Sequence, residues 1–207
     1  MFKNLYRLYD KIQILILSKG YLKNYKLKKG DTVLDLGAFF GSFSIIAAKK
    51  VGPSGKVIAY EPDKRNFEIL KQNVKESGLK NIVIVNKAIF DKKATLNLSS
   101  SFSSSNLFNK NLLNTNKIQA DTIDNELKRL NIKKVDFVKM DVEGAEIEVM
   151  NGAKNNLKNI KNFAIACYHK RNGKTTGELL KPFFEKKGFK ASIGFFIHPT
   201  LYVNKFF

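Results

Sequence analysis

Short apolar runs alternate with longer amphipathic stretches through most of the chain, and this alternation limits the folds open to it. The first three runs are Thr32–Leu36, Lys56–Tyr60 and Ile82–Val85, each four or five residues long. Runs of this length bounded by glycine or proline are typical of buried strands. Strands that alternate with helices favour a parallel sheet. We therefore expect an α/β fold: a doubly wound, mostly parallel sheet with helices on both faces.

The stretches between these runs predict where helices begin and end. Residues 42–51 are expected to form a helix that stops at Gly52 and Pro53. Pro62 is expected just inside the next helix, a favoured position for proline, and Gly78 is expected to end that helix.

The second half of the chain continues the pattern. Asp121 or Thr122 is expected to cap a helix that ends near Leu130. The segment 99–120 is rich in Ser and Asn and is expected to be a long loop, after a short extended piece at 94–98. Loops this long in compact domains are often functional. The remaining elements are expected as a strand over 135–140, a helix from about 145, a strand over 163–168, a helix over 175–187 and the last strands within 189–203.

The N-terminal stretch is expected to be an appendage to a single domain that covers residues 31–207. Apolar residues recur at helical spacing within residues 1–30, and basic residues recur every four positions beside them. This pattern predicts an amphipathic helix that packs on the domain as a lid or outer layer. Contact with a membrane surface is the alternative. The residues that form the pattern are Leu5, Leu8, Ile12, Leu15 and Ile16 with Lys3, Arg7 and Lys11.

The formal net charge of +19 is concentrated on the two flanks. Residues 1–30 carry eight basic and one acidic residue, and residues 153–207 carry eleven basic and two acidic residues. Residues 31–152 carry 18 basic and 15 acidic residues, so they are close to neutral. A basic surface attracts nucleic acid, anionic lipid or acidic substrates. A general lysine bias of the composition is the competing explanation.

Several classes of protein are disfavoured by composition. The single cysteine, Cys167, excludes a disulfide framework and a cysteine-based zinc site. The apolar run near the N-terminus, residues 14–17, is far shorter than the roughly 20 residues that span a bilayer. Lysines follow this run in place of a small-residue cleavage site, so a signal peptide is not expected. The default expectation is a reduced, cytoplasmic setting.

The turn after the first predicted strand indicates which ligands the sheet binds. In such sheets, ligands bind at the carboxyl ends of the strands, near the switch in strand order. The turn has Gly37 and Gly41, but Phe39 stands where the dinucleotide fingerprint needs its second glycine. The bulky side chain disfavours a pyrophosphate. Glu61 ends the second strand, where a carboxylate can accept hydrogen bonds from ribose hydroxyls. The pattern favours a nucleoside without a pyrophosphate.

These residues resemble the S-adenosylmethionine-dependent methyltransferases of the Rossmann-like class, specifically the FkbM family. The resemblance covers roughly residues 31–153 and continues more weakly to about 193. Two positions depart from the family pattern: Phe39 stands where Asn is common, and Cys167 occupies the Glu place of a Glu-x-His sequence that ends at His169. The matching segments are Val33–Ala38 with Gly41, Tyr60–Pro62, Asn86–Ile89, Asp121–Asp124 and, most specifically, Asp136–Glu146.

The resemblance implies S-adenosylmethionine as the cofactor. It would place Asp35 and Gly37 at the methionine end, Glu61 at the ribose, and residues 86–88 at the adenine edge. Asp141 would face the reacting methyl group. The full set of cofactor-binding residues expected in this way is Asp35, Gly37, Ala38, Phe39, Gly41, Glu61, Pro62, Asn86, Lys87, Ala88 and Asp141.

The candidate catalytic residues are Asp141, Glu143 and His169. A hydroxyl acceptor must lose its proton, and a histidine with a pKa near 6.5 is a good general base. A structural, hydrogen-bonded His169 is the competing interpretation, and His198 is expected to be structural. The same three residues offer an alternative site for a divalent cation. Glu146 is expected to support the start of a helix.

The acceptor implied by the resemblance is a hydroxyl of a small molecule, a glycan or a lipid-linked sugar. Two alternatives stay open. The basic flanks would suit an RNA methyltransferase, although no RNA-binding module is recognisable. The basic N-terminal stretch would suit a membrane-surface binding protein.

Overall fold

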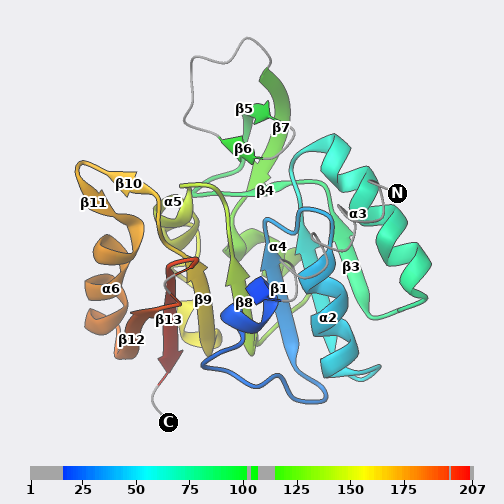
Figure 1. The fold of residues 1–207 in the computed structure, drawn as a ribbon, viewed down its shortest axis with the longest axis horizontal. Coiled ribbons are helices and arrows are strands. Elements are labelled where there is room, and N and C mark those ends of the chain that lie inside the picture. Colours follow the sequence, from blue (N-terminus) through cyan, green and yellow to red (C-terminus); the bar gives the residue numbers. More distant parts are fainter. Residues whose placement is uncertain (1–15, 102–103, 107–114, 196, 206–207) are drawn as a thin grey trace.

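A seven-stranded sheet forms the centre of the molecule, in the order β12-β13-β9-β8-β1-β2-β3 (Figure 1). The computed structural model describes residues 16–101, 104–106, 115–195 and 197–205. Strand β13 is antiparallel to both of its neighbours, and the other pairings are parallel. This confirms the expected doubly wound, mostly parallel sheet. The strands are β1 (Thr32–Leu36), β2 (Lys56–Tyr60), β3 (Ile82–Val85), β8 (Phe137–Met140), β9 (Asn162–Ala166), β12 (Phe189–Gly194) and β13 (Thr200–Lys205).

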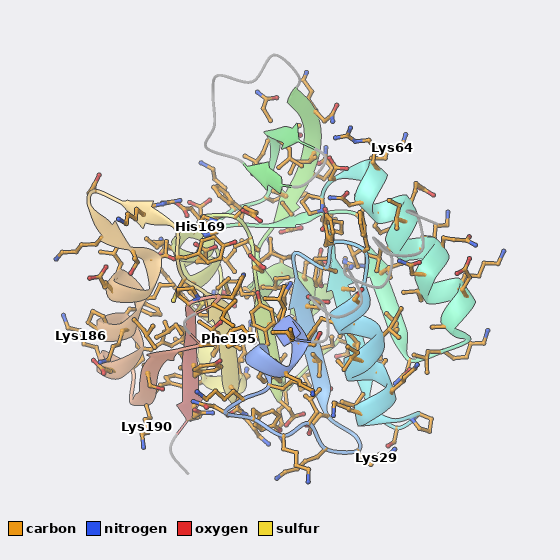
Figure 2. The ribbon with its side chains drawn as sticks, viewed as in Figure 1. Lys29, Lys64, His169, Lys186, Lys190 and Phe195 are labelled. Carbon is orange, nitrogen blue, oxygen red and sulfur yellow. The ribbon has the colours of Figure 1, made fainter. Side chains whose placement is uncertain are left out.

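Lysine side chains project from the outer surface, as Figure 2 shows for Lys29, Lys64, Lys186 and Lys190. Lys29 and Lys190 lie at the edge of the sheet where the parallel strands begin. Within the described ranges, no helix combines the length and the apolar character that a membrane crossing requires.

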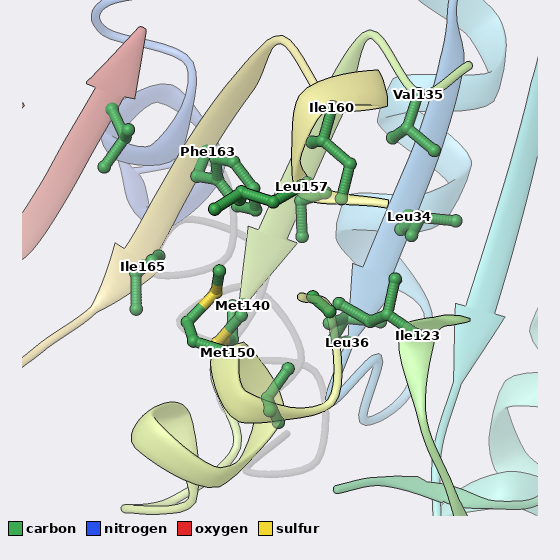
Figure 3. Close-up of a cluster of buried hydrophobic side chains, with 14 of the residues drawn as sticks. Leu34, Leu36, Ile123, Val135, Met140, Met150, Leu157, Ile160, Phe163 and Ile165 are labelled. Carbon is green, nitrogen blue, oxygen red and sulfur yellow. The ribbon is translucent and has the colours of Figure 1, made fainter. Parts of the chain in front are cut away.

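Helices cover both faces of the sheet because successive strand residues point to opposite faces. On one face, Leu34, Ile58 and Met140 belong to a buried cluster that packs against α4, α5 and α6 (Figure 3). On the other face, Val33 and Val57 pack against α2, and α3 contacts the edge strand β3. The helices are α2 (Ser42–Val51), α3 (Lys64–Ser77), α4 (Ile123–Arg129), α5 (Glu146–Asn151) and α6 (Thr176–Lys186), with a 3₁₀ turn at Leu157–Asn159.

The start of α3 corrects one expectation. Pro62 does not lie inside the helix, because Asp63 is the N-cap and the helix begins at Lys64. The Asp63 carboxylate accepts hydrogen bonds from the backbone N–H groups of Arg65 and Asn66, which leaves Pro62 in the turn from β2. Gly78 ends the helix in the left-handed conformation, as expected.

The segment 99–120, expected as a loop, contributes strands to a second sheet. This sheet has the order β4-β7-β5-β6 and rises above the main sheet in the view of Figure 1. Leu98 on β5 and Ile118 on β7 are buried in one small cluster, which explains why a polar stretch pairs as strands. The many Ser and Asn residues around these two apolar positions led to the prediction of a loop. The strands are β4 (Ala88–Ile89), β5 (Ala94–Ser101), β6 (Ser104–Asn106) and β7 (Thr115–Asp121).

Other expected elements appear with small shifts. Thr122 caps α4 by accepting a hydrogen bond from the Asn125 N–H group. A short hairpin of β10 (Lys170–Arg171) and β11 (Lys174–Thr175) precedes α6. Most of the predicted N-terminal amphipathic helix lies outside the described residues. The described part of the N-terminal stretch is helical over residues 16–21. The boundary between residues 30 and 31 stays a prediction.

Candidate active site

A cavity of about 320 Å³ lies where the carboxyl ends of β1, β2, β3 and β8 meet. The strand order reverses between β1 and β8, since β2 and β3 lie on one side and β9 on the other. Ligands bind at such a switch point in doubly wound sheets. The lining residues are Leu17, Ser18, Tyr21, Gly37, Ala38, Phe39, Phe43, Tyr60, Glu61, Pro62, Asn66, Lys87, Ala88, Ile89, Leu98, Lys139, Asp141, Val142, Glu143 and Ala145.

The turn after β1 forms one wall of the cavity. Gly37 has a φ of 75°, and a Cβ atom at this position would overlap the backbone oxygen of Asp141. The turns after β1 and β8 therefore touch at a point that only glycine allows. Gly41 does not line the cavity; it has a φ of 85° and packs against Leu70 of α3.

Phe39 lies in the same turn and lines the cavity. Its φ of 52° lies in the left-handed region, which Asn adopts more readily than Phe, and its side chain is 38% exposed. Its ring stacks on Phe40 at 3.7 Å between centroids. Its backbone N–H donates to Oε2 of Glu61 at 2.8 Å, which links the turns after β1 and β2.

Glu61 is buried at the end of β2 and lines the cavity. Burial raises the pKa of its carboxyl to about 7, although hydrogen bonds from the Phe39 and Asp63 N–H groups oppose the shift. The Asp63 N–H donates to Oε1 at 3.0 Å. Each carboxylate oxygen keeps further acceptor capacity, so the group is suited to receive hydroxyl donors from a ligand.

Asp35, expected at the methionine end of a cofactor, is fully buried and does not line the cavity. Its carboxylate lies 3.2 Å from Nζ of Lys139 and accepts a hydrogen bond from the Ser44 hydroxyl. Nζ of Lys139 also donates to the backbone oxygen of Gly37 at 2.6 Å. Lys139 is the residue of this pair that reaches the cavity. A lysine inside the apolar run of β8 was the signal that could have identified it.

The residues after β3 divide into two groups. Asn86 does not line the cavity, because its side-chain amide donates to the backbone oxygens of Glu61 at 2.8 Å and Pro62 at 3.1 Å. It therefore braces the turn after β2. Pro62, Lys87 and Ala88 do line the cavity.

The ammonium of Lys87 pairs with two carboxylates that do not line the cavity. It lies 2.8 Å from a carboxylate oxygen of Glu126 and 3.7 Å from one of Asp121. Glu126 is buried and also binds Arg129 and the Tyr60 hydroxyl. This network ties the small sheet and α4 to the cavity wall.

Asp141 follows β8 and lines the cavity, as expected. Its Oδ2 atom accepts a hydrogen bond from the Tyr21 hydroxyl at 2.8 Å. Its Oδ1 atom is buried without a hydrogen-bond partner among the described residues. Nε2 of His198 lies 3.7 Å from Oδ2. The two contacts bring one residue from the N-terminal part and one from the C-terminal part of the chain to this carboxylate, which the sequence did not indicate.

His169 lies between two carboxylates. Its Nε2 atom is 3.2 Å from Glu143, which lines the cavity, and its Nδ1 atom is 3.3 Å from Glu146, which is fully buried. Burial alone would lower the pKa of His169, but the hydrogen bond with Glu143 and the adjacent Glu146 carboxylate raise it to about 10. The imidazole is therefore protonated at neutral pH, which disfavours the expected role as a general base.

The structure does not support the alternative metal site. Within residues 16–101, 104–106, 115–195 and 197–205, no group of three or more His, Cys, Asp or Glu side chains is arranged to hold a metal ion. Glu143 and His169 contact each other directly, while Asp141 binds Tyr21.

Comparisons with known proteins identify relatives of this chain. The family model described as "Methyltransferase FkbM domain" matches residues 35–191. A "Probable cobalt-precorrin-6B C(15)-methyltransferase (decarboxylating)" of Sulfurisphaera tokodaii is 38% identical over 76 residues, which are 37% of this chain and 37% of that protein. The chain thus spans well under half the length of the curated relative it matches.

Solved structures share the fold at low sequence identity. A SAM-dependent methyltransferase from Aquifex aeolicus aligns with a TM-score of 0.54 and 19% identity, over 88% of this chain and 86% of that chain. Fibrillarin of Aeropyrum pernix, whose crystal structure contains natively bound S-adenosyl-L-methionine, aligns with a TM-score of 0.60 and 14% identity, over 93% of this chain and 74% of that chain.

Proposed function

Because the chain belongs to the FkbM methyltransferase family, we propose that it transfers a methyl group from S-adenosylmethionine to a hydroxyl of a small molecule, a glycan or a lipid-linked sugar. One observation carries the proposal. The Gly37 turn, the Glu61 carboxylate and the Asp141 carboxylate all line one cavity at the switch point of the sheet.

The cavity has polar groups suited to this cofactor. Glu61 can accept hydrogen bonds from both hydroxyls of a ribose. Asp141 lines the cavity with a partly exposed carboxylate, whose negative charge favours a cationic or hydrogen-bond-donating ligand. Apolar side chains, among them Ile89 and Leu98, supply a wall for a flat ring. When bound, S-adenosylmethionine supplies an electrophilic methyl group on a positively charged sulfur.

Different residues of the cavity then position the cofactor and remove the proton of the acceptor hydroxyl. Lys139 positions the Gly37 turn by donating a hydrogen bond to its backbone oxygen. Asp141 faces the positive charge. Glu143 lines the cavity and is the carboxylate we assign to accept the proton of the acceptor hydroxyl. His169, protonated between Glu143 and Glu146, holds Glu143 in place. Holding two reactants in line is worth about 7–11 kcal/mol in favourable cases.

Calorimetry with S-adenosylmethionine and S-adenosylhomocysteine tests the cofactor site. We expect E61A to weaken binding of both at least tenfold, because the ribose loses its acceptor. Glu68 is an exposed glutamate on α3 that pairs with Lys71 at 3.8 Å, so E68A is the matched control and should bind normally. Equal binding by E61A and the wild type would refute the ribose assignment.

The acceptor class requires a separate experiment. Purified protein and a radiolabelled methyl donor, incubated with a cell extract, should label a hydroxyl-bearing small molecule or glycan. Label that resists protease and ribonuclease would support this class. Label on protein or RNA would refute it.

RNA methylation is a second candidate, because the basic excess lies on the flanks at residues 1–30 and 153–207. Binding to RNA would weaken steeply with salt, since it depends on release of counterions. A filter assay with tRNA at low salt tests it. Retention that disappears as salt rises would favour RNA, and no retention at low salt would eliminate it.

A further inference from the structure

Two residues outside the matched region 35–191 meet at the carboxylate of Asp141. The hydroxyl of Tyr21 donates to Oδ2 at 2.8 Å, and Nε2 of His198 lies 3.7 Å from the same oxygen. The rings of Tyr21 and His198 also contact each other edge to face, with centroids 5.5 Å apart. The two flanks of the family domain therefore converge on one residue of the cavity.

The segment that carries Tyr21 is anchored on the sheet. The backbone oxygen of Gly20 accepts a hydrogen bond from the Tyr202 hydroxyl of β13 at 2.6 Å. A Cβ atom at Gly20 would overlap the ring of Phe195, so this close approach depends on glycine. Leu17, Ser18 and Tyr21 line the cavity from this segment. It is thus a wall of the site, built from residues far apart in the chain.

Among the residues that the structure describes, the Tyr21 hydroxyl makes one hydrogen bond, to Asp141. Its side chain is buried, and burial together with the nearby Asp141 raises the pKa of the phenol well above its usual value. The phenol therefore stays a donor toward Oδ2 of Asp141. This hydrogen bond fixes the orientation of the Asp141 carboxylate, which lines the cavity. The Tyr21 ring also lies 5.5 Å from Nζ of Lys139, which adds a cation–π contact on the same side.

We propose that the N-terminal segment around Tyr21 completes the cofactor cavity, and that Tyr21 is a positioning residue that fixes the Asp141 carboxylate toward the charged sulfur of the cofactor. This inference rests on the proposed function, because it assumes that S-adenosylmethionine occupies the cavity. It assigns a role to a segment that precedes the matched family domain.

The test compares two ligands that differ in charge at sulfur. S-adenosylmethionine carries a positive sulfur and S-adenosylhomocysteine a neutral one. Calorimetry with Y21F should show roughly tenfold weaker binding of S-adenosylmethionine and a clearly smaller loss for S-adenosylhomocysteine. D141N should likewise lose more affinity for S-adenosylmethionine than for S-adenosylhomocysteine. If Tyr21 acts through Asp141, the double variant Y21F/D141N should be no more selective than D141N alone.

Tyr25 supplies a matched control in the same segment. Its hydroxyl donates to Oδ2 of Asp31 at 3.0 Å, and it does not line the cavity. Y25F removes an equivalent hydrogen bond and should bind both ligands as the wild type does. Y21F would overturn the inference by binding both ligands normally, or by losing both equally. Binding by the wild type distinguishes this failure from that of the proposed function: if the wild type binds neither ligand, the cofactor assignment itself is wrong.

Discussion

Asp35 on β1 and Lys139 on β8 are register partners in the sheet, and their charged groups form a buried ion pair of 3.2 Å. The same ammonium holds the backbone oxygen of Gly37. The pair therefore connects β1 and β8, the two strands on either side of the switch point. It also positions the Gly37 turn, which lines the cavity.

Replacing Lys139 by Met should be strongly destabilising. The change leaves the Asp35 carboxylate buried without its countercharge, which typically costs about 3–5 kcal/mol of unfolding free energy. Urea denaturation measures it. D35N/K139M should recover much of the loss, because no lone charge remains. Lys71 is 62% exposed in its ion pair with Glu68, so K71M should change stability by less than about 0.5 kcal/mol. A K139M protein as stable as K71M would contradict this account.

Gly37→Ala tests the contact between the turns after β1 and β8. The added Cβ atom must displace the backbone of Asp141. Gly78 offers a matched control, because its φ of 69° resembles that of Gly37 but a Cβ atom there meets nothing within 4 Å. We expect G78A to cost about 1 kcal/mol and G37A distinctly more, with loss of S-adenosylmethionine binding only in G37A. Thermal melting and calorimetry measure the two effects. Equal costs would show that the turns do not touch.

Binding of S-adenosylmethionine should depend on pH through Glu61. Its pKa of about 7 in the free protein means that the carboxyl is partly protonated at neutral pH. Ribose hydroxyls favour the charged form, so affinity should fall by up to about tenfold per pH unit below 7. Calorimetry at pH values on both sides of 7 checks this. E61Q should bind more weakly and without that dependence; an unchanged pH profile in E61Q would disprove the link.

The same Glu61 shift affects the stability of the free protein. The folded pKa lies above the ordinary value of 4.5, so the folded state binds a proton that the unfolded state has released between pH 4.5 and about 7. Stability should therefore decrease as pH rises through this window. E61Q should remove this contribution in urea titrations.

His169 should also make stability decrease with rising pH, but over a higher pH window than Glu61. Its pKa rises from 6.5 to about 10, so its stabilisation is complete below pH 6.5 and is lost as pH rises through 10. H169Q should lower the unfolding free energy by about 2 kcal/mol at neutral pH and less at pH 10. H198Q is the control, because burial lowers the pKa of His198 and leaves it neutral across that range. A constant difference between wild type and H169Q from pH 7 to 10 would contradict the assigned charge.

Local patterns in the sequence predicted the main sheet and much of the site. The strand ends, Gly37, Glu61 and Asp141 could be placed because residues after parallel strands share one edge of the sheet. The small sheet was missed because its strands are rich in Ser and Asn. Tyr21 and His198 were missed for a different reason: 120 and 57 positions separate them from Asp141, and no local pattern encodes such a contact.

A crystal structure with S-adenosylhomocysteine is the most direct test of the central claim. We predict that the nucleoside occupies the cavity between the Gly37 turn and Glu61, with both ribose hydroxyls within hydrogen-bond distance of the Glu61 carboxylate. Density for the ligand at another site, or a ribose that does not contact Glu61, would contradict the account.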